Sequence, residues 1–144
     1  RHAAALIARR ALTDEVSVGA GYRLYLDSWG LSSHTIDVDG AWVPSAPWLV
    51  SLGYRFYTQN SASHYEPFYK AMPTPKYYTS DKELSAGSSH RIAFELSRAF
   101  DIDDGESLLR TVLVAAPTFY QYSEFPQLDS ITAFELTLSM ELLR

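Results

Sequence analysis

The sequence contains no cysteine. Disulfide frameworks, thiolate metal sites and thiol nucleophiles are therefore excluded from this 144-residue chain. It also lacks any apolar run near the roughly 20 residues that a transmembrane helix needs. The absence of a long apolar run does not exclude a membrane barrel, because the lipid-facing residues of a barrel lie in short alternating segments.

Positive charge is scarce and scattered. Twelve Lys and Arg residues stand against 17 Asp and Glu, giving a net charge of -5 and a pI near 5.3. Because nucleic-acid binding needs clustered basic residues to displace counterions, no nucleic-acid partner is expected. The chain begins Arg1-His2-Ala3, without an initiator Met or a signal peptide. This start predicts a fragment of a longer protein.

The phrase Gly-Tyr-Arg-x-Tyr occurs twice, at residues 21–25 and 53–57. Each copy lies within a segment of alternating apolar and polar residues, 16–27 and 48–59, which is typical of a β-strand with two different faces. Similar alternation predicts two more strands, at residues 89–100 and 133–142. Less regular alternation predicts three others, at residues 2–12, 33–43 and 108–125. Pro117 lacks a backbone donor, which predicts a bulge or a sheet edge at that point.

The connections between these segments alternate in length. Residues 13–15, 44–47 and 101–106 are short, whereas 28–32, 60–86 and 124–130 lie at the opposite ends of the strands. This pattern is typical of outer-membrane barrels, whose short turns are periplasmic. We therefore predict an all-β fold, an antiparallel up-and-down transmembrane β-barrel represented by about seven strands. Residues 1–144 would form a single domain, the C-terminal part of a larger barrel, with loop 60–86 outside the cell.

Aromatic residues make up 14% of the chain, including ten Tyr. They gather near both ends of the predicted strands, as the two aromatic belts of a membrane barrel do. The group by the short turns comprises Trp42, Trp48 and Phe100. The group toward the longer loops comprises Tyr22, Tyr25, Trp29, Tyr54, Phe56, Tyr57, Tyr120 and Tyr122. The alternative is a soluble β-barrel or sandwich whose apolar face points inward. An apolar ligand would then contact Val16, Leu24, Leu52, Phe94 and Leu136.

Two stretches, residues 22–35 and 54–65, resemble an uncharacterised bacterial outer-membrane β-barrel family catalogued as domain of unknown function 3570. They contain Tyr-Arg-x-Tyr, Trp-Gly and Ser-His-Thr in the first stretch, and Arg-x-Tyr with Ser-Ala and a later Tyr in the second. The close match covers about a third of the chain. Ser28 and Asn60 depart from the family pattern, and the chain ends Glu141-Leu142-Leu143-Arg144 without a terminal aromatic residue. The resemblance implies a location in the bacterial outer membrane, a barrel with more strands than these seven, and no established activity.

Charged and aromatic residues on the predicted polar face are candidates to line a barrel lumen. They are Arg23, Tyr25, Asp37, Asp39, Arg55, Tyr57, Arg91, Glu95 and Glu135. Arg23 and Arg55 occupy equivalent positions, and their guanidinium groups would either select anions along a permeation path or bridge to acidic residues on neighbouring strands. A barrel wall of this kind would suit a pore, a transport component or a surface scaffold.

The long loop 60–86 contains candidate recognition residues, namely His64, Tyr65, Tyr69 and Tyr77. These side chains would recognise a ligand outside the cell, plug the barrel mouth or pack against its rim. Lys70, Lys76 and Lys82 in the same loop predict contact with lipopolysaccharide. Outer-membrane lipid and the barrel-insertion machinery are the other expected partners, and the ligand is unknown.

Catalytic and metal-binding motifs are weak. The four His residues lack the spacing of a zinc site, and Asp37 with Asp39 would suit either calcium or solvent. Ser-His occurs three times without Gly-x-Ser-x-Gly, and adjacent strand residues face opposite ways. No cofactor, metal site or catalytic residue is therefore predicted, although a barrel-embedded hydrolase stays as a further alternative.

Overall fold

Seven β-strands follow one another along the chain in the computed structural model, which describes residues 1–69, 77–102 and 107–143. The strands are β1 (His2–Ala11), β2 (Val16–Leu26), β3 (Ser32–Trp42), β4 (Trp48–Gln59), β5 (Gly87–Ile102), β6 (Ser107–Tyr122) and β7 (Ser130–Leu143). A single 3-10 turn, η1 (Lys82–Leu84), is the one helical segment in the described ranges. None of the described residues forms a helix that is long and apolar enough to span a membrane. The predicted all-β class is confirmed.

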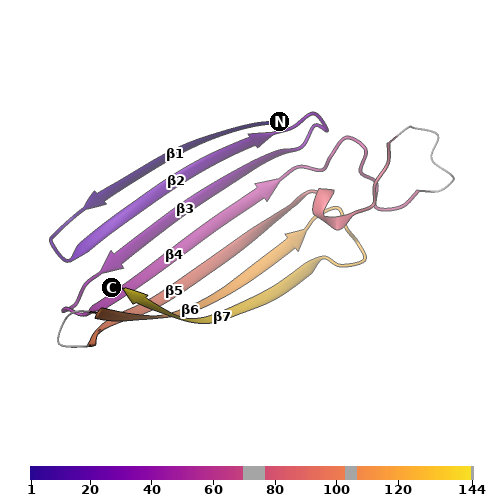
Figure 1. The fold of residues 1–144 in the computed structure, drawn as a ribbon. Coiled ribbons are helices and arrows are strands. Elements are labelled where there is room, and N and C mark those ends of the chain that lie inside the picture. Colours follow the sequence, from indigo (N-terminus) through magenta and orange to yellow (C-terminus); the bar gives the residue numbers. More distant parts are fainter. Residues whose placement is uncertain (70–76, 103–106, 144) are drawn as a thin grey trace.

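The strands form one open sheet in sequence order, and every neighbouring pair is antiparallel. Figure 1 shows the short connections at one end of the sheet, together with the C-terminus, and the longer connections at the other end with the N-terminus. This confirms the up-and-down order, with β1 and β7 as the free edges, as in part of a barrel. Positions 70–76 of the predicted loop and 103–106 of the predicted turn fall outside the described residues.

The prediction for Pro117 was wrong. β6 is an inner strand, and Pro117 pairs with Phe134 of β7. On the other side, the pairs Arg91 with Thr118 and Phe94 with Ala115 keep one register, so no residue is inserted. The ladder between β5 and β6 is interrupted opposite Pro117, because proline has no N–H to donate. Regular pairing on both sides of the gap preserves the strand.

The register sorts side chains into two faces, since partners across an antiparallel ladder point to the same side. We call them the apolar face and the polar face. In β2 the apolar face holds Val16, Val18, Ala20, Tyr22 and Leu24, and the polar face holds Ser17, Gly19, Gly21, Arg23 and Tyr25. The same division continues through the other strands. The predicted separation of faces is thus present.

In the inner strands the apolar face is the more exposed of the two, whereas nearly all residues of the edge strands β1 and β7 are exposed on both faces. Within β6, Ala116 and Thr118 on the polar face are 1% and 9% exposed, whereas Leu113 and Phe119 on the apolar face are 38% and 43% exposed. Leu136 of β7 is 67% exposed, because no second layer covers this side of the sheet in the described residues. This distribution is expected if the sheet curves toward its polar face, where side chains crowd together.

Candidate functional site

Charged residues on the polar face are brought together by the register of neighbouring strands. Asp37 of β3 lies opposite Gly21 of β2 and opposite Arg55 of β4. Arg55 in turn lies opposite Arg91 of β5. Acidic and basic residues that are far apart in the sequence therefore share one row across the sheet.

Arginines and carboxylates of the polar face form a network of four ion pairs in the described part of the chain, which we call the arginine–carboxylate network. The shortest nitrogen–oxygen distances are 2.6 Å between Arg55 and Asp37, and 2.7 Å between Arg9 and Asp39. The other two pairs are Arg91 with Glu135 at 3.0 Å and Arg110 with Glu95 at 3.7 Å. Arg110 also donates to the Ser97 hydroxyl at 3.1 Å.

Two of these pairs join strands that are not neighbours, and each passes over a small residue. Arg9 of β1 reaches Asp39 of β3 over Gly19 of β2, which stands opposite both of them. A Cβ atom added to Gly19 would lie 2.6 Å from Asp39 Oδ1. Arg91 of β5 similarly reaches Glu135 of β7 past β6, where Ala116 stands opposite Glu135. Small residues thus make room for the longer pairs.

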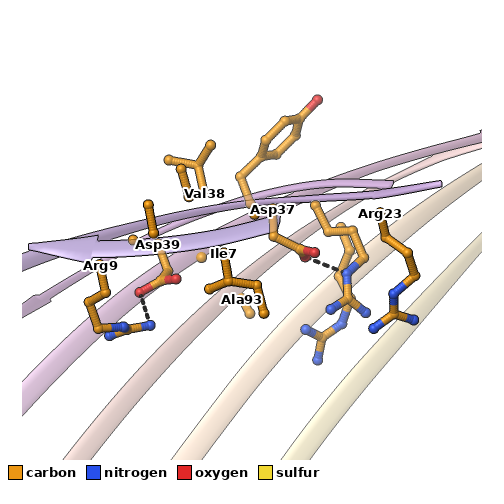
Figure 2. A pocket seen from close by; sticks show the side chains of 15 residues that line it. Ile7, Arg9, Arg23, Asp37, Val38, Asp39 and Ala93 are labelled. Carbon is orange, nitrogen blue, oxygen red and sulfur yellow. Dashed lines mark hydrogen bonds and ion pairs between the residues drawn. The ribbon is translucent and has the colours of Figure 1, made fainter. Parts of the chain in front are cut away.

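A hollow of about 420 Å³ lies within this network. Gly19, Gly21, Gly53 and Ala93 provide parts of its lining that carry little or no side chain. The charged lining comprises Arg9, Arg23, Asp37, Asp39, Arg55 and Arg91. Figure 2 shows Arg9, Arg23 and Asp39 on one side of the sheet and Val38 on the other. The hollow therefore combines open space with four guanidinium groups and two carboxylates.

Arg23 differs from the other arginines of the hollow. It makes no hydrogen bond or ion pair with any residue that the structure describes. Its partners across the ladders are Ala5 of β1 and Thr35 of β3, neither of which carries a charge. The prediction that acidic residues bridge these arginines therefore holds for Arg55 and fails for Arg23.

Other predicted residues of the polar face have local partners. The Tyr25 hydroxyl donates to Asp27, and the Tyr57 hydroxyl donates to Gln59, two residues along in each case. Sequence reasoning missed Arg9 and Arg110, which complete two of the four ion pairs. The short 13–15 turn could have identified Arg9, because it fixes the register that places Arg9 opposite Gly19.

The repeated phrase also forms a repeated contact on the apolar face. The Tyr22 hydroxyl lies 2.7 Å from His34 Nδ1 on β3, and the Tyr54 hydroxyl lies 2.8 Å from His90 Nδ1 on β5. These bonds give two of the four His residues a structural role. No group of three or more His, Asp or Glu suited to a metal ion occurs among the described residues.

The loop candidates divide into two tyrosines that support the loop and two rings at its surface. Tyr65 is buried and its hydroxyl donates to the Glu124 carbonyl at 2.9 Å, while burial raises the pKa of this phenol. The Tyr69 hydroxyl donates to the His64 carbonyl at 2.7 Å. The His64 and Tyr77 rings lie 5.8 Å apart at the edge of a hollow of about 280 Å³. Tyr65 and Tyr69 therefore hold the loop in place.

The loops are tied together at the family-like residues. The Asp27 carboxylate accepts from the backbone N–H of Trp29 at 2.8 Å and of Leu31 at 3.2 Å. Asn60, which departs from the family pattern, accepts from Ser32 and donates to the Gly30 carbonyl at 2.9 Å. Gly30 has a φ of 76°, a conformation that favours glycine. These bonds join the connection after β2 to the start of the long loop.

Of the three loop lysines, only Lys82 lies within the described residues; Lys70 and Lys76 lie outside them. Lys82 pairs with Glu83 at 3.0 Å, and that hydrogen bond raises the pKa of the lysine. The positive charge of Lys82 is thus matched by its neighbour. The predicted contact with lipopolysaccharide stays a prediction.

An antiparallel sheet whose strands follow one another in sequence order has the topology of the up-and-down β-barrels, and this open sheet is consistent with part of one. Within that class, a family model described as protein of unknown function DUF3570 matches residues 1–108. The chain belongs to this family, as the resemblance of its two motif stretches predicted. No curated protein and no solved structure gives a significant match.

Proposed function

We propose that this chain is part of the wall of a bacterial outer-membrane β-barrel. Its apolar face would contact lipid, and its polar face would line the lumen. The exposure of the two faces carries this proposal. In a soluble barrel the apolar face is the sheltered one, whereas here Leu52 and Leu136 are 58% and 67% exposed. That finding disfavours the soluble barrel, in which these two residues line a pocket.

Strand length and interfacial residues support the same proposal. The strands contain 10 to 16 residues, and a tilted transmembrane strand needs about 9 to 11. Near the short turns, the Arg98 guanidinium lies 4.7 Å from the Trp48 ring centre and 4.5 Å from that of Phe100. Aromatic rings that hold a long cationic side chain are typical of a membrane–water interface.

The other expected belt lies toward the longer connections. Tyr22 and Tyr54 stand on the apolar face with their hydroxyls bonded to His34 and His90. Each ring thus offers apolar surface while its polar group is satisfied, as a position near lipid requires. Lipid, lipopolysaccharide and the barrel-insertion machinery would be the partners of such a wall.

The network on the polar face supports a lumen role, either as a filled wall or as part of a transport path. Opposite charges bridging between strands suit an enclosed polar space, because uncompensated charges would repel. The hollow and its arginines favour a path for solutes over a purely structural wall.

Fractionation of the full-length parent protein tests the location. We expect it to sediment with outer membranes, to resist carbonate extraction and to migrate faster on a gel when unheated. Single cysteines at Leu52 and Ser51 of a cysteine-free parent would test the faces. Leu52→Cys should react poorly with a water-soluble maleimide, and a fluorophore attached there should be quenched by lipid-borne quenchers. Ser51→Cys should react readily with the same maleimide, and a fluorophore attached there should not be quenched from the lipid. A parent that stays soluble without detergent would overturn the proposal.

A further inference from the structure

Arg23 is an exposed cation on the polar face whose structural counterpart, Arg55, is neutralised. The two arginines stand at the same place in the repeated phrase, one on β2 and the other on β4. Arg55 lies opposite Asp37 on the preceding strand, and Arg23 lies opposite Ala5 on its own preceding strand. Ala5 thus occupies, beside Arg23, the position that Asp37 occupies beside Arg55.

The neighbouring arginines keep hydrogen-bond donors free for a further acceptor. A guanidinium group has five N–H donors. Arg55 uses Nε toward Asp37, and Arg91 uses one terminal nitrogen toward Glu135. The described residues supply no acceptor to the two terminal nitrogens of Arg55. These donors line the same hollow as the guanidinium of Arg23.

The charge of the hollow has one sign in excess. Four arginines and two aspartates line it, whereas the carboxylate that pairs with Arg91 lies outside the lining. Because Glu135 offsets Arg91, the excess is one positive charge, that of Arg23, in a hollow of about 420 Å³ where Gly21 and Gly53 leave space. A planar guanidinium matches the geometry of phosphate and carboxylate oxygens.

We propose that this hollow binds the oxyanion group of a small solute, a phosphate or a carboxylate, with Arg23 as the principal contact. Arg55 and Arg91 contribute their remaining donors. The site deepens the proposed function, on which its placement in a lumen rests, because the anion would be held on the lumen wall. A lipid phosphate is the less suitable source, since the hollow opens on the face opposite the exposed apolar side chains.

Inorganic phosphate is the probe for this site. The full-length parent is purified in a non-ionic detergent without phospholipid, and its thermal unfolding is followed by loss of the fast-migrating gel band. Phosphate is titrated against chloride at constant ionic strength, so that general screening is the same throughout. We expect the unfolding midpoint to rise with phosphate and to saturate. A midpoint that does not respond to phosphate would overturn the proposal.

Two variants identify the contact. Arg23→Gln should raise the half-saturating phosphate concentration by about tenfold or more, the scale of a lost charge-assisted hydrogen bond. Ala5→Asp should do the same while retaining Arg23, because it supplies the partner that Arg55 already has. An Arg23→Gln protein that does not fold would leave Ala5→Asp to decide the question.

Arg10→Gln is the matched control. Arg10 lies opposite Val18 and so stands on the apolar face of β1, and its loss removes an equal charge without touching the hollow. We expect its phosphate response to match that of the parent. An equal weakening in Arg10→Gln and Arg23→Gln would overturn the proposal in favour of non-specific attraction. Adding phospholipid at fixed phosphate should leave the response unchanged, whereas competition would identify a lipid headgroup as the ligand and overturn the choice of a free solute.

The two proposals fail separately. A parent that is soluble without detergent overturns the membrane location. The phosphate responses of the parent and of Arg23→Gln can still be compared in that case, and this comparison tests the hollow. A parent that sediments with outer membranes but ignores phosphate leaves the location standing and removes the anion site.

Discussion

The two copies of Gly-Tyr-Arg-x-Tyr have the same local structure but different electrostatic surroundings. In both, the first Tyr bonds to a His on the following strand, and the second Tyr bonds to a polar side chain two residues later. Both arginines stand on the polar face. Only Arg55 has an acidic partner, Asp37, whereas Arg23 stands between Ala5 and Thr35. The repeat therefore determines where a side chain points, and the neighbouring strands determine what it meets.

The largest effect is expected from a substitution that disrupts the separation of the two faces, which both copies share. Leu52 directly precedes the second copy on the apolar face, and Ser51 lies beside it on the polar face opposite Glu95. If the apolar face contacts lipid as proposed, Leu52→Arg should lower the free energy of unfolding from lipid vesicles by about 2–4 kcal/mol, because the charge would enter hydrocarbon. Ser51→Arg should change it by less than about 1 kcal/mol, since Glu95 offers a partner. Equal losses in urea titrations would contradict the assignment of faces.

The glycines around the two copies give a smaller, matched comparison. Gly21 and Gly53 open the copies, and a Cβ atom at either would meet its nearest neighbour at 3.7 Å or 3.9 Å, an ordinary contact. Gly19→Ala would instead displace the Asp39 carboxylate from Arg9. We expect Gly19→Ala to cost about 1 kcal/mol of unfolding free energy and Gly53→Ala to be neutral or slightly stabilising. Urea midpoints that fall alike in both variants would count against the Arg9–Asp39 pair.

The difference between the two arginines predicts a coupling in one copy only. A double-mutant cycle of Arg55→Gln with Asp37→Asn should give a coupling energy of about 0.5–1 kcal/mol, the usual scale for a partly exposed pair. The cycle of Arg23→Gln with Asp37→Asn should give a coupling near zero. Both are read from urea unfolding of the folded barrel. Comparable couplings would mean that Asp37 serves both arginines.

The smallest expected effect tests the sameness of the two copies on the apolar face. Tyr22→Phe and Tyr54→Phe each remove one hydroxyl bond to a histidine, at 2.7 Å and 2.8 Å. Each should lower the free energy of unfolding by about 0.5–1 kcal/mol, and the two losses should agree. The double variant should lose the sum, because the two pairs lie on different strands. A loss in only one variant would show that the repeated contact is not equivalent in the two copies.

Much of the fold could be predicted because period-two alternation depends on neighbouring residues alone. The predicted strands 16–27 and 48–59 match β2 and β4 within one residue. Pro117 was misjudged because the cost of one missing donor is local, while the pairs around it hold the register. Arg9 was missed because alanine occurs on both faces of β1, so that its alternation is weak.

The sequence by itself determined the strands, their order and the residues that share a face, because each follows from side-chain alternation and the length of the connections. Only the tertiary structure decided that the apolar face is the exposed one and that Asp37 meets Arg55 while Arg23 meets no acid in the described chain. The reason is that register brings together residues distant in sequence, and the shape of the whole sheet decides which of its faces is crowded.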